Sequence, residues 1–121
     1  TRSPRSIVLQ AARAAASAAA VALVARALPK NMAITRIAPN PFNPRTTIHF
    51  DVARRGVIGL GIYDVRGHLV RDLVTGTLPQ GRHEAVWDGR DRSGRAAAAG
   101  VYFVRMTGEG KSLTSKMVLA K

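Results

Sequence analysis

Asp88 and Asp91, followed by a serine two residues further on, are the side chains in this sequence that most resemble a metal site, because calcium prefers oxygen ligands. A calcium loop of the EF type needs ligands at positions 1, 3 and 5 and glycine at position 6. Counted from Asp88, positions 3 and 5 are Arg90 and Arg92, which repel a cation. The spacing therefore predicts a turn, in which Asp91 accepts hydrogen bonds from the backbone ahead of Gly94.

The other candidate groups do not form a catalytic or metal-binding constellation. His49, His68 and His83 lie far apart and lack the His-x-x-x-His spacing of zinc sites. Gly59 and Gly61 lie within an expected strand and not ahead of a helix, so they are not a phosphate loop. The chain has no cysteine and no Gly-x-Ser-x-Gly elbow. We therefore expect a protein that is not an enzyme and that uses no cofactor or metal.

The charge is strongly basic, with a formal net charge of +12 from 19 Lys and Arg against 7 Asp and Glu. Five of the basic residues precede Ile34, so the remaining chain carries fourteen bases and seven acids, a net charge of +7. These bases are spread at intervals, whereas a nucleic-acid-binding protein usually gathers them on one face or helix. The pattern favours a solvated basic surface over a nucleic-acid partner.

Residues 1–30 differ in composition from the rest of the chain and allow two interpretations. Scattered arginines flank an alanine-dominated stretch over residues 14–25. One interpretation is a secretory signal peptide with a small-x-small cleavage site at residues 25–27, although the chain begins with Thr1 and not Met. The other is an Ala-rich helix at the end of an upstream region, which Pro29 would stop. In both interpretations residues 1–30 lie outside the fold. The alanine-dominated stretch over residues 14–25 is shorter than the roughly 20 apolar residues that a transmembrane helix needs.

Residues 31–45 are expected to be a linker and a Pro-rich lead-in to the folded domain. Three prolines between residues 39 and 44 are incompatible with a helix and with a central strand. Asn40 and Asn43 can close turns onto their own backbone. Phe42 is the large apolar residue of this segment, so we expect it to fill the base of the core.

From residue 34 onward, apolar and polar residues alternate between turn signals, as in half-buried strands. The expected strands are residues 34–37, 46–52, 57–64, 69–74, 101–107 and 112–119, with a further strand after residue 80. Residues 64–68 form a tight hairpin in which Gly67 supplies a positive φ. Short strands with turn signals at about ten-residue spacing predict an all-β, antiparallel β-sandwich of about seven strands over residues 34–121.

Residues 81–106 contain the single tryptophan, Trp87, and one of the two tyrosines, Tyr102. Two apolar runs flank a centre that is rich in Gly, Asp and Ser. This pattern predicts a β-hairpin with a long polar connection. In a chain with so few aromatic residues, Trp87 and Tyr102 are expected to anchor the core.

Several of these segments together resemble the Ig-like C-terminal module of many bacterial secreted proteins. The resemblance covers about residues 34–121, in order and at natural spacing, through residues 39–44 with 46–48, 63–70, 81–83, 87–91 with Gly94, and 100–103. It implies an Ig-like sandwich without catalytic activity. We assign fold-anchoring roles to the residues that define these motifs: Pro39, Asn40, Pro41, Phe42, Tyr63, Asp64, Gly67, Trp87, Asp88, Gly89, Asp91, Gly94, Gly100 and Tyr102.

The resemblance implies two alternative functions. One is that of the C-terminal sorting domain of the type IX (Por) secretion system, which would direct an exported protein through the periplasm to the outer-membrane secretion and shuttle machinery and the cell surface. The other is that of the structural Ig-like domain of a flagellar hook-assembly scaffold or a surface adhesion protein. The sorting function is favoured because the sequence stops at a strand that looks like the terminal strand of that family. In the sorting family this strand is read by the machinery, which corresponds here to Lys116, Met117, Val118, Leu119, Ala120 and Lys121.

Two features depart from the family pattern. The alanine run over residues 96–99 replaces a more polar or proline-containing loop. Gly59 and Gly61 stand where a core strand would carry larger residues. Each glycine is expected to cost about 0.5–1 kcal/mol relative to alanine.

Overall fold

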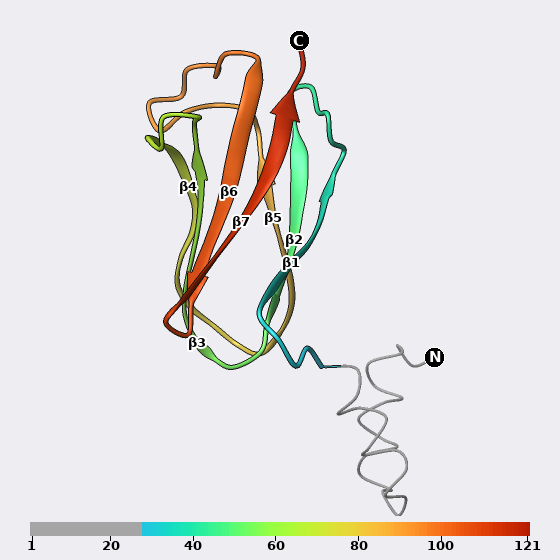
Figure 1. The fold of residues 1–121 in the computed structure, drawn as a ribbon, viewed down its shortest axis with the longest axis vertical. Coiled ribbons are helices and arrows are strands. Elements are labelled where there is room, and N and C mark those ends of the chain that lie inside the picture. Colours follow the sequence, from blue (N-terminus) through green and yellow to red (C-terminus); the bar gives the residue numbers. More distant parts are fainter. Residues whose placement is uncertain (1–27) are drawn as a thin grey trace, which may run out of the picture.

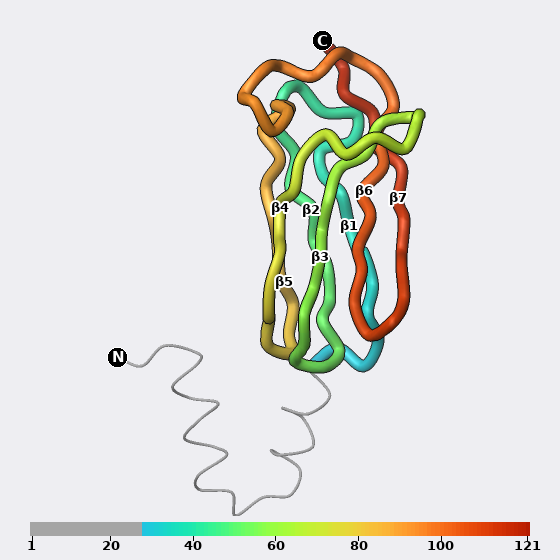
Figure 2. The backbone as a smooth tube through the Cα atoms, turned by 90° about the vertical axis from the view of Figure 1, so that its left-hand side faces the viewer, coloured from blue at the N-terminus to red at the C-terminus, as the bar shows by residue number. Residues whose placement is uncertain are grey.

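The computed structural model describes residues 28–121, which fold into two packed antiparallel sheets (Figures 1 and 2). One sheet has three strands in the order β1-β2-β5, and the other has four in the order β4-β3-β6-β7. The strands are β1 (Ala33–Ala38), β2 (Thr46–Val52), β3 (Gly56–Tyr63), β4 (Leu69–Leu78), β5 (Gly81–Trp87), β6 (Gly100–Gly108) and β7 (Lys111–Leu119). The expected Ig-like β-sandwich is confirmed. The two interpretations of residues 1–30 fall almost entirely on residues 1–27, which lie outside the described part of the chain.

The core lies between the sheets and is built by alternation along the strands. The apolar residues at alternate positions of β2 and β3 point inward and are at most 1% exposed. Burying each of these apolar side chains contributes about 1.5–3 kcal/mol relative to leaving it in water. The fully buried large side chains are Trp87, Phe42, Phe50, Ile48, Ile58, Leu60, Ile62, Met106, Met117, Leu119, Val52 and Val104.

The prediction of a hairpin over residues 81–106 is wrong. β5 pairs with β2 in one sheet, whereas β6 pairs with β3 and β7 in the other. Residues 88–99 are therefore a crossover between the sheets (Figure 2). Hairpin loops usually have two to five residues, and this longer connection lets Trp87 and Tyr102 approach from opposite sheets, with ring centroids 5.2 Å apart.

The prediction about Gly59 and Gly61 also needs correction. The core-facing residues of β3 alternate with these glycines, so a side chain at either glycine would point to the outer face of the sheet. A Cβ atom at Gly59 would lie 2.6 Å from the Thr107 hydroxyl, and one at Gly61 would lie 3.2 Å from the Tyr63 ring. Neighbouring side chains cover both positions from outside, so the core has no gap there.

Candidate recognition site at the terminal strand

The expected recognition strand is β7, which forms one edge of the four-stranded sheet. Met117 and Leu119 face inward and are 0% and 1% exposed. Lys116 is exposed on the opposite face, and Val118 is half-buried there. Of the six residues predicted to be read by a partner, two are therefore core residues, while Lys116, Val118, Ala120 and Lys121 remain accessible in the folded domain.

The outer edge of β7 is bound by the Pro-rich lead-in. The Asn40 side chain accepts a hydrogen bond from the Val118 backbone N–H at 3.0 Å and donates one to the Lys116 carbonyl at 3.5 Å. A single amide group thus occupies the donor and the acceptor that a neighbouring strand would otherwise use. We expected Asn40 to close a turn onto its own backbone. In these contacts its side chain instead bonds to β7, far along the chain.

Phe42 continues this pairing with its backbone. Its N–H donates to the Val118 carbonyl at 3.0 Å, and its carbonyl accepts from the Ala120 N–H at 2.8 Å, forming a parallel bridge to Leu119. The Phe42 side chain is 2% exposed and packs on Trp87 with ring centroids 5.4 Å apart. We call the contacts of Asn40 and Phe42 with residues 116–120 the clasp.

The clasp has a direct consequence for recognition. It satisfies the outward backbone groups of β7 from Lys116 to Ala120, which an added strand would need. A partner must therefore either contact the exposed side chains of this segment or displace Asn40 and Phe42. An open hollow of about 200 Å³ lies next to the clasp between β1 and β7, and is lined by Arg36, Lys116 and five uncharged residues.

Two aspartate turns at one end of the sandwich share one hydrogen-bond pattern. In each, the aspartate carboxylate accepts from the backbone N–H two and four residues later at 2.9–3.0 Å. The aspartate carbonyl also accepts from the glycine three residues later, at 3.0 Å. Gly67 and Gly94 adopt positive φ angles of 83° and 87°. Each turn thus has the form Asp-x-x-Gly followed by a basic residue. This repeated spacing is visible in the sequence.

These bonds stabilise the ionised carboxylates. The backbone N–H of His68 is the main cause that lowers the pKa of Asp64 below its usual 3.8. The Ser93 hydroxyl, 2.7 Å from Asp91, is the main cause that lowers the pKa of Asp91. The sequence prediction of a turn at Asp91 agrees with this geometry. Among the described residues, no group of three His, Cys, Asp or Glu side chains lies close enough to hold a metal ion.

The crossover after β5 is held to the core by polar contacts of aromatic residues. Trp87 donates from its indole nitrogen to the Arg90 carbonyl at 2.9 Å. The Tyr102 hydroxyl donates to the Ala98 carbonyl, four residues upstream, at 2.6 Å. Such a bond at the start of a strand resembles the tyrosine corner of Ig-like domains. Burial is the main cause that raises the pKa of Tyr102 above 10.0.

The remaining residues that we assigned to fold anchoring lie near these contacts or on the sheet exterior. Gly89 has a φ of 76° and lies so close to Pro44 that a Cβ atom would be 2.7 Å from the Pro44 carbonyl oxygen. The Asp88 carboxylate accepts from the Arg90 N–H at 3.0 Å. Tyr63 lies on the outer face under Arg105, whose guanidinium carbon is 5.8 Å from the ring centroid. Gly100 begins β6. Pro41 is exposed and lies between Asn40 and Phe42. The Pro39 carbonyl accepts a hydrogen bond from the buried Thr46 hydroxyl at 2.7 Å.

None of the described residues belongs to a helix long and apolar enough to cross a membrane.

Residues 53–112 match the family model of the FlgD Ig-like domain. None of the curated proteins matches this chain.

Similar folds occur in solved structures of larger proteins. The dimeric latent PorU of Porphyromonas gingivalis matches 70% of this chain at 21% identity with a TM-score of 0.58. PorZ, an essential bacterial surface component of the type-IX secretion system of the same organism, matches 71% of the chain at 23% identity with a TM-score of 0.51. The chain spans 9% of PorU and 11% of PorZ. FlgD from P. aeruginosa matches 62% of this chain at 22% identity, covering 60% of FlgD, with a TM-score of 0.46.

Proposed function

We propose that this chain, an Ig-like module of the FlgD Ig-like domain family, is a non-catalytic sorting module that targets an exported protein to the outer-membrane type IX secretion machinery. The observation that carries the proposal is the clasp. It joins the two most distant motifs, residues 39–44 and 116–121, at one edge of the sandwich. The fold that the chain shares with PorU and PorZ supports the same assignment.

In this function the module acts by recognition and performs no reaction. The partner is a protein of the secretion and shuttle machinery, and the module travels through the periplasm to the outer membrane or cell surface. The clasp leaves Lys116 and Val118 on the outer surface of β7, where a partner can contact them without unfolding the domain. The basic surface serves protein recognition here and not nucleic-acid binding.

The test is export of a reporter in a bacterium that has type IX secretion. The chain is fused behind a reporter that carries its own periplasmic export signal, and reporter activity is measured in the periplasm and outside the cell. We expect at least tenfold more reporter outside the cell than for the reporter alone. Retention of the whole fusion in the periplasm would overturn the proposal.

A matched pair of variants tests the role of the clasped segment. Lys116→Glu and Lys111→Glu reverse one exposed charge each on the same strand, but only Lys116 lies at the clasp. We expect K116E to leave the reporter in the periplasm and K111E to export it normally. Equal export of both variants would place the recognition surface elsewhere.

The family match over residues 53–112 favours a second function, that of an Ig-like domain in a flagellar hook-assembly scaffold. The test replaces the Ig-like domain of FlgD with residues 28–121 in a motile bacterium and scores swimming. Restored motility, together with failure of the sorting assay, would favour the scaffold function. Loss of motility with reporter export favours sorting.

A further inference from the structure

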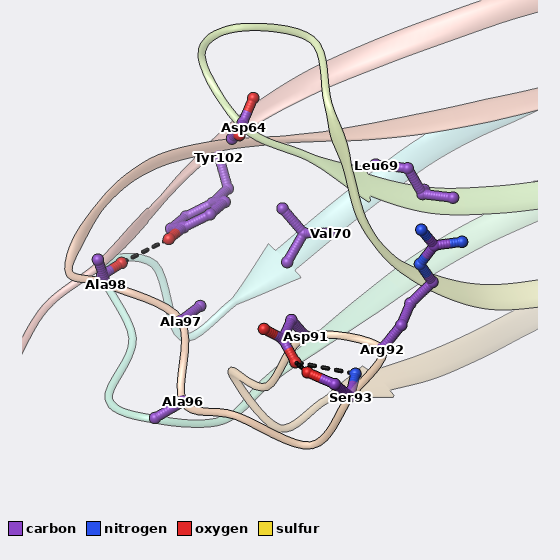
Figure 3. Close-up of a pocket in the computed structure, with 10 residues that line it drawn as sticks. All are labelled: Asp64, Leu69, Val70, Asp91, Arg92, Ser93, Ala96, Ala97, Ala98 and Tyr102. Carbon is purple, nitrogen blue, oxygen red and sulfur yellow. Dashed lines mark hydrogen bonds between the residues drawn. The ribbon is translucent and has the colours of Figure 1, made fainter.

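An open hollow of about 450 Å³ lies at the end of the sandwich between the two aspartate turns (Figure 3). Its lining is mixed. Val70 of β4 and Ala96, Ala97 and Ala98 of the crossover supply aliphatic side chains, the Tyr102 ring lies on one side, and Asp64, Asp91, Arg92 and Ser93 supply polar groups. This volume is within the range of protein sites that accept small ligands or side chains. Three of the crossover residues that line the hollow, Ala96, Ala97 and Ala98, carry only methyl side chains.

The walls of the hollow are fixed by hydrogen bonds before any partner arrives. The Arg92 N–H donates to the Val70 carbonyl at 3.0 Å, which joins the crossover to β4. The Ala97 N–H donates to the Gly89 carbonyl at 2.8 Å, and the Tyr102 hydroxyl binds the Ala98 carbonyl. A preformed site avoids much of the ordering cost of binding.

The acidic and the basic side chains around the hollow differ in whether they already have hydrogen-bond or ion-pair partners. The carboxylates of Asp64 and Asp91 are already occupied by N–H groups of their own turns, and that of Asp91 also by the Ser93 hydroxyl. Arg66, Arg92 and Arg95 are exposed on the same two turns and form no ion pair with any residue in the range 28–121. Asp64 and Asp91 keep their negative charge, but Arg66, Arg92 and Arg95 outnumber them, so the two turns together carry a small positive net charge.

We propose that this hollow is a docking site for an acidic peptide segment of a partner protein. The segment inserts one apolar side chain between Val70 and Ala97 and places carboxylates against Arg66, Arg92 and Arg95. A second copy of the chain is disfavoured as occupant because it would bring the same cations face to face. The inference goes beyond the sorting function, since a scaffold or a sorting module could each use this surface.

The test uses the full chain and synthetic seven-residue peptides with a central leucine flanked by two acidic residues on each side. Binding is followed by NMR shifts of backbone amides and by fluorescence anisotropy of labelled peptide. We expect the acidic peptide to shift the amides of Val70, Arg92, Ala97 and Tyr102. Peptides with lysines in place of the acids, or serine in place of leucine, should bind at least tenfold more weakly.

Two variants and a control identify the surface. Ala96→Leu enlarges a side chain that lines the hollow, and the double variant R92E/R95E reverses the charge beside it. The matched control R54E/R55E makes the same charge change at exposed arginines in the turn between β2 and β3. We expect tenfold weaker binding for A96L and for R92E/R95E, and unchanged binding for R54E/R55E, with the tryptophan fluorescence of the fold retained in each.

Three results would overturn the proposal. Equal binding of acidic and basic peptides would show that charge does not select the partner. Equal loss in R54E/R55E and R92E/R95E would show only a general attraction of a basic protein. Concentration-dependent dimers that A96L dissolves would assign the hollow to a second copy of the chain.

Discussion

The turns at residues 64–68 and 91–95 close with the same hydrogen bonds but lead the chain to different places. The first joins β3 to β4, which are neighbours in one sheet. The second lies within the crossover from β5 to β6, which belong to different sheets. The difference lies in what surrounds each turn. Ladder hydrogen bonds support the first on both sides, whereas the second depends on Trp87 and Tyr102 and on its contact with Val70.

The comparison shows that a turn motif sets a local reversal but not the sheet that the next strand joins. At the crossover, the contacts of Trp87 and Tyr102 accompany the change of sheet. Substitutions in the residues that support the two turns should therefore change stability by very different amounts. The same substitution at matching positions within the two turns should change it nearly equally.

The largest expected effect comes from Trp87→Ala, which removes the buried support of the crossover. Replacing a fully buried tryptophan by alanine costs about 3–5 kcal/mol, a large part of the roughly 5–15 kcal/mol that keeps such a domain folded. Urea unfolding measures the loss. The control Val65→Ala changes a 69% exposed side chain at the tip of the first turn and should alter stability by less than about 0.5 kcal/mol. Similar losses for both variants would remove the proposed distinction.

Gly67→Ala and Gly94→Ala test whether the two turns are equivalent. Both glycines have positive φ, and an added Cβ atom would meet nothing within 4 Å at either position. Only the backbone conformation opposes the substitution, so each should cost about 1–2 kcal/mol. Urea titrations of the two variants should agree closely. A much larger cost at Gly94 would mean that the crossover turn is under a constraint that the first turn lacks.

Tyr102→Phe removes the bond that ties β6 back to the crossover. The Ala98 carbonyl loses its 2.6 Å donor while the ring packing on Trp87 is kept. The expected cost is about 1 kcal/mol, measured by thermal unfolding. Amide hydrogen exchange should speed up at residues 96–98 and stay unchanged at residues 64–68. Equal acceleration in both turns would contradict a local role for this hydroxyl.

The smallest effect is the dependence of stability on low pH. The pKa values of Asp64 and Asp91 are lowered in the folded state, so the unfolded state binds more protons as acid is added. Their stabilisation is complete above the unfolded value near 3.8 and is lost as the pH falls through the lowered folded values. The urea midpoint should fall over this window. A variant with Asp64→Asn and Asp91→Asn should show a shallower fall, and an unchanged slope would assign the effect to other carboxylates.

Much of this fold follows from local pattern. Alternation in residues 46–52 places Ile48, Phe50 and Val52 in the core, and the spacing around Gly67 predicts the first turn. The strand expected over residues 69–74 ends too early, because β4 continues through Gly76 to Leu78. Glycine has a low strand propensity, so local pattern alone does not predict this extension.

The sheet membership of β6 and the contacts of Asn40 could not be predicted in the same way. The bond between Asn40 and Val118 joins residues separated by 78 positions. No local propensity reports such a contact, because it depends on where the whole fold brings the two segments together. The hollow beside the alanine run is similar, since its walls come from β4, the crossover and β6.

The clasp also determines how the domain responds to mechanical force. Residues 39–44 follow directly after β1, residues 116–121 include the end of β7, and the two segments run parallel where they pair. Tension applied from upstream of Pro39 and downstream of Ala120 pulls these segments in opposite directions along their length. The bonds of Asn40 and Phe42 then share the load at the same time and do not open one after another. The β1–β2 ladder lies between the upstream chain and the clasp, so the same tension also loads that edge strand of the sandwich.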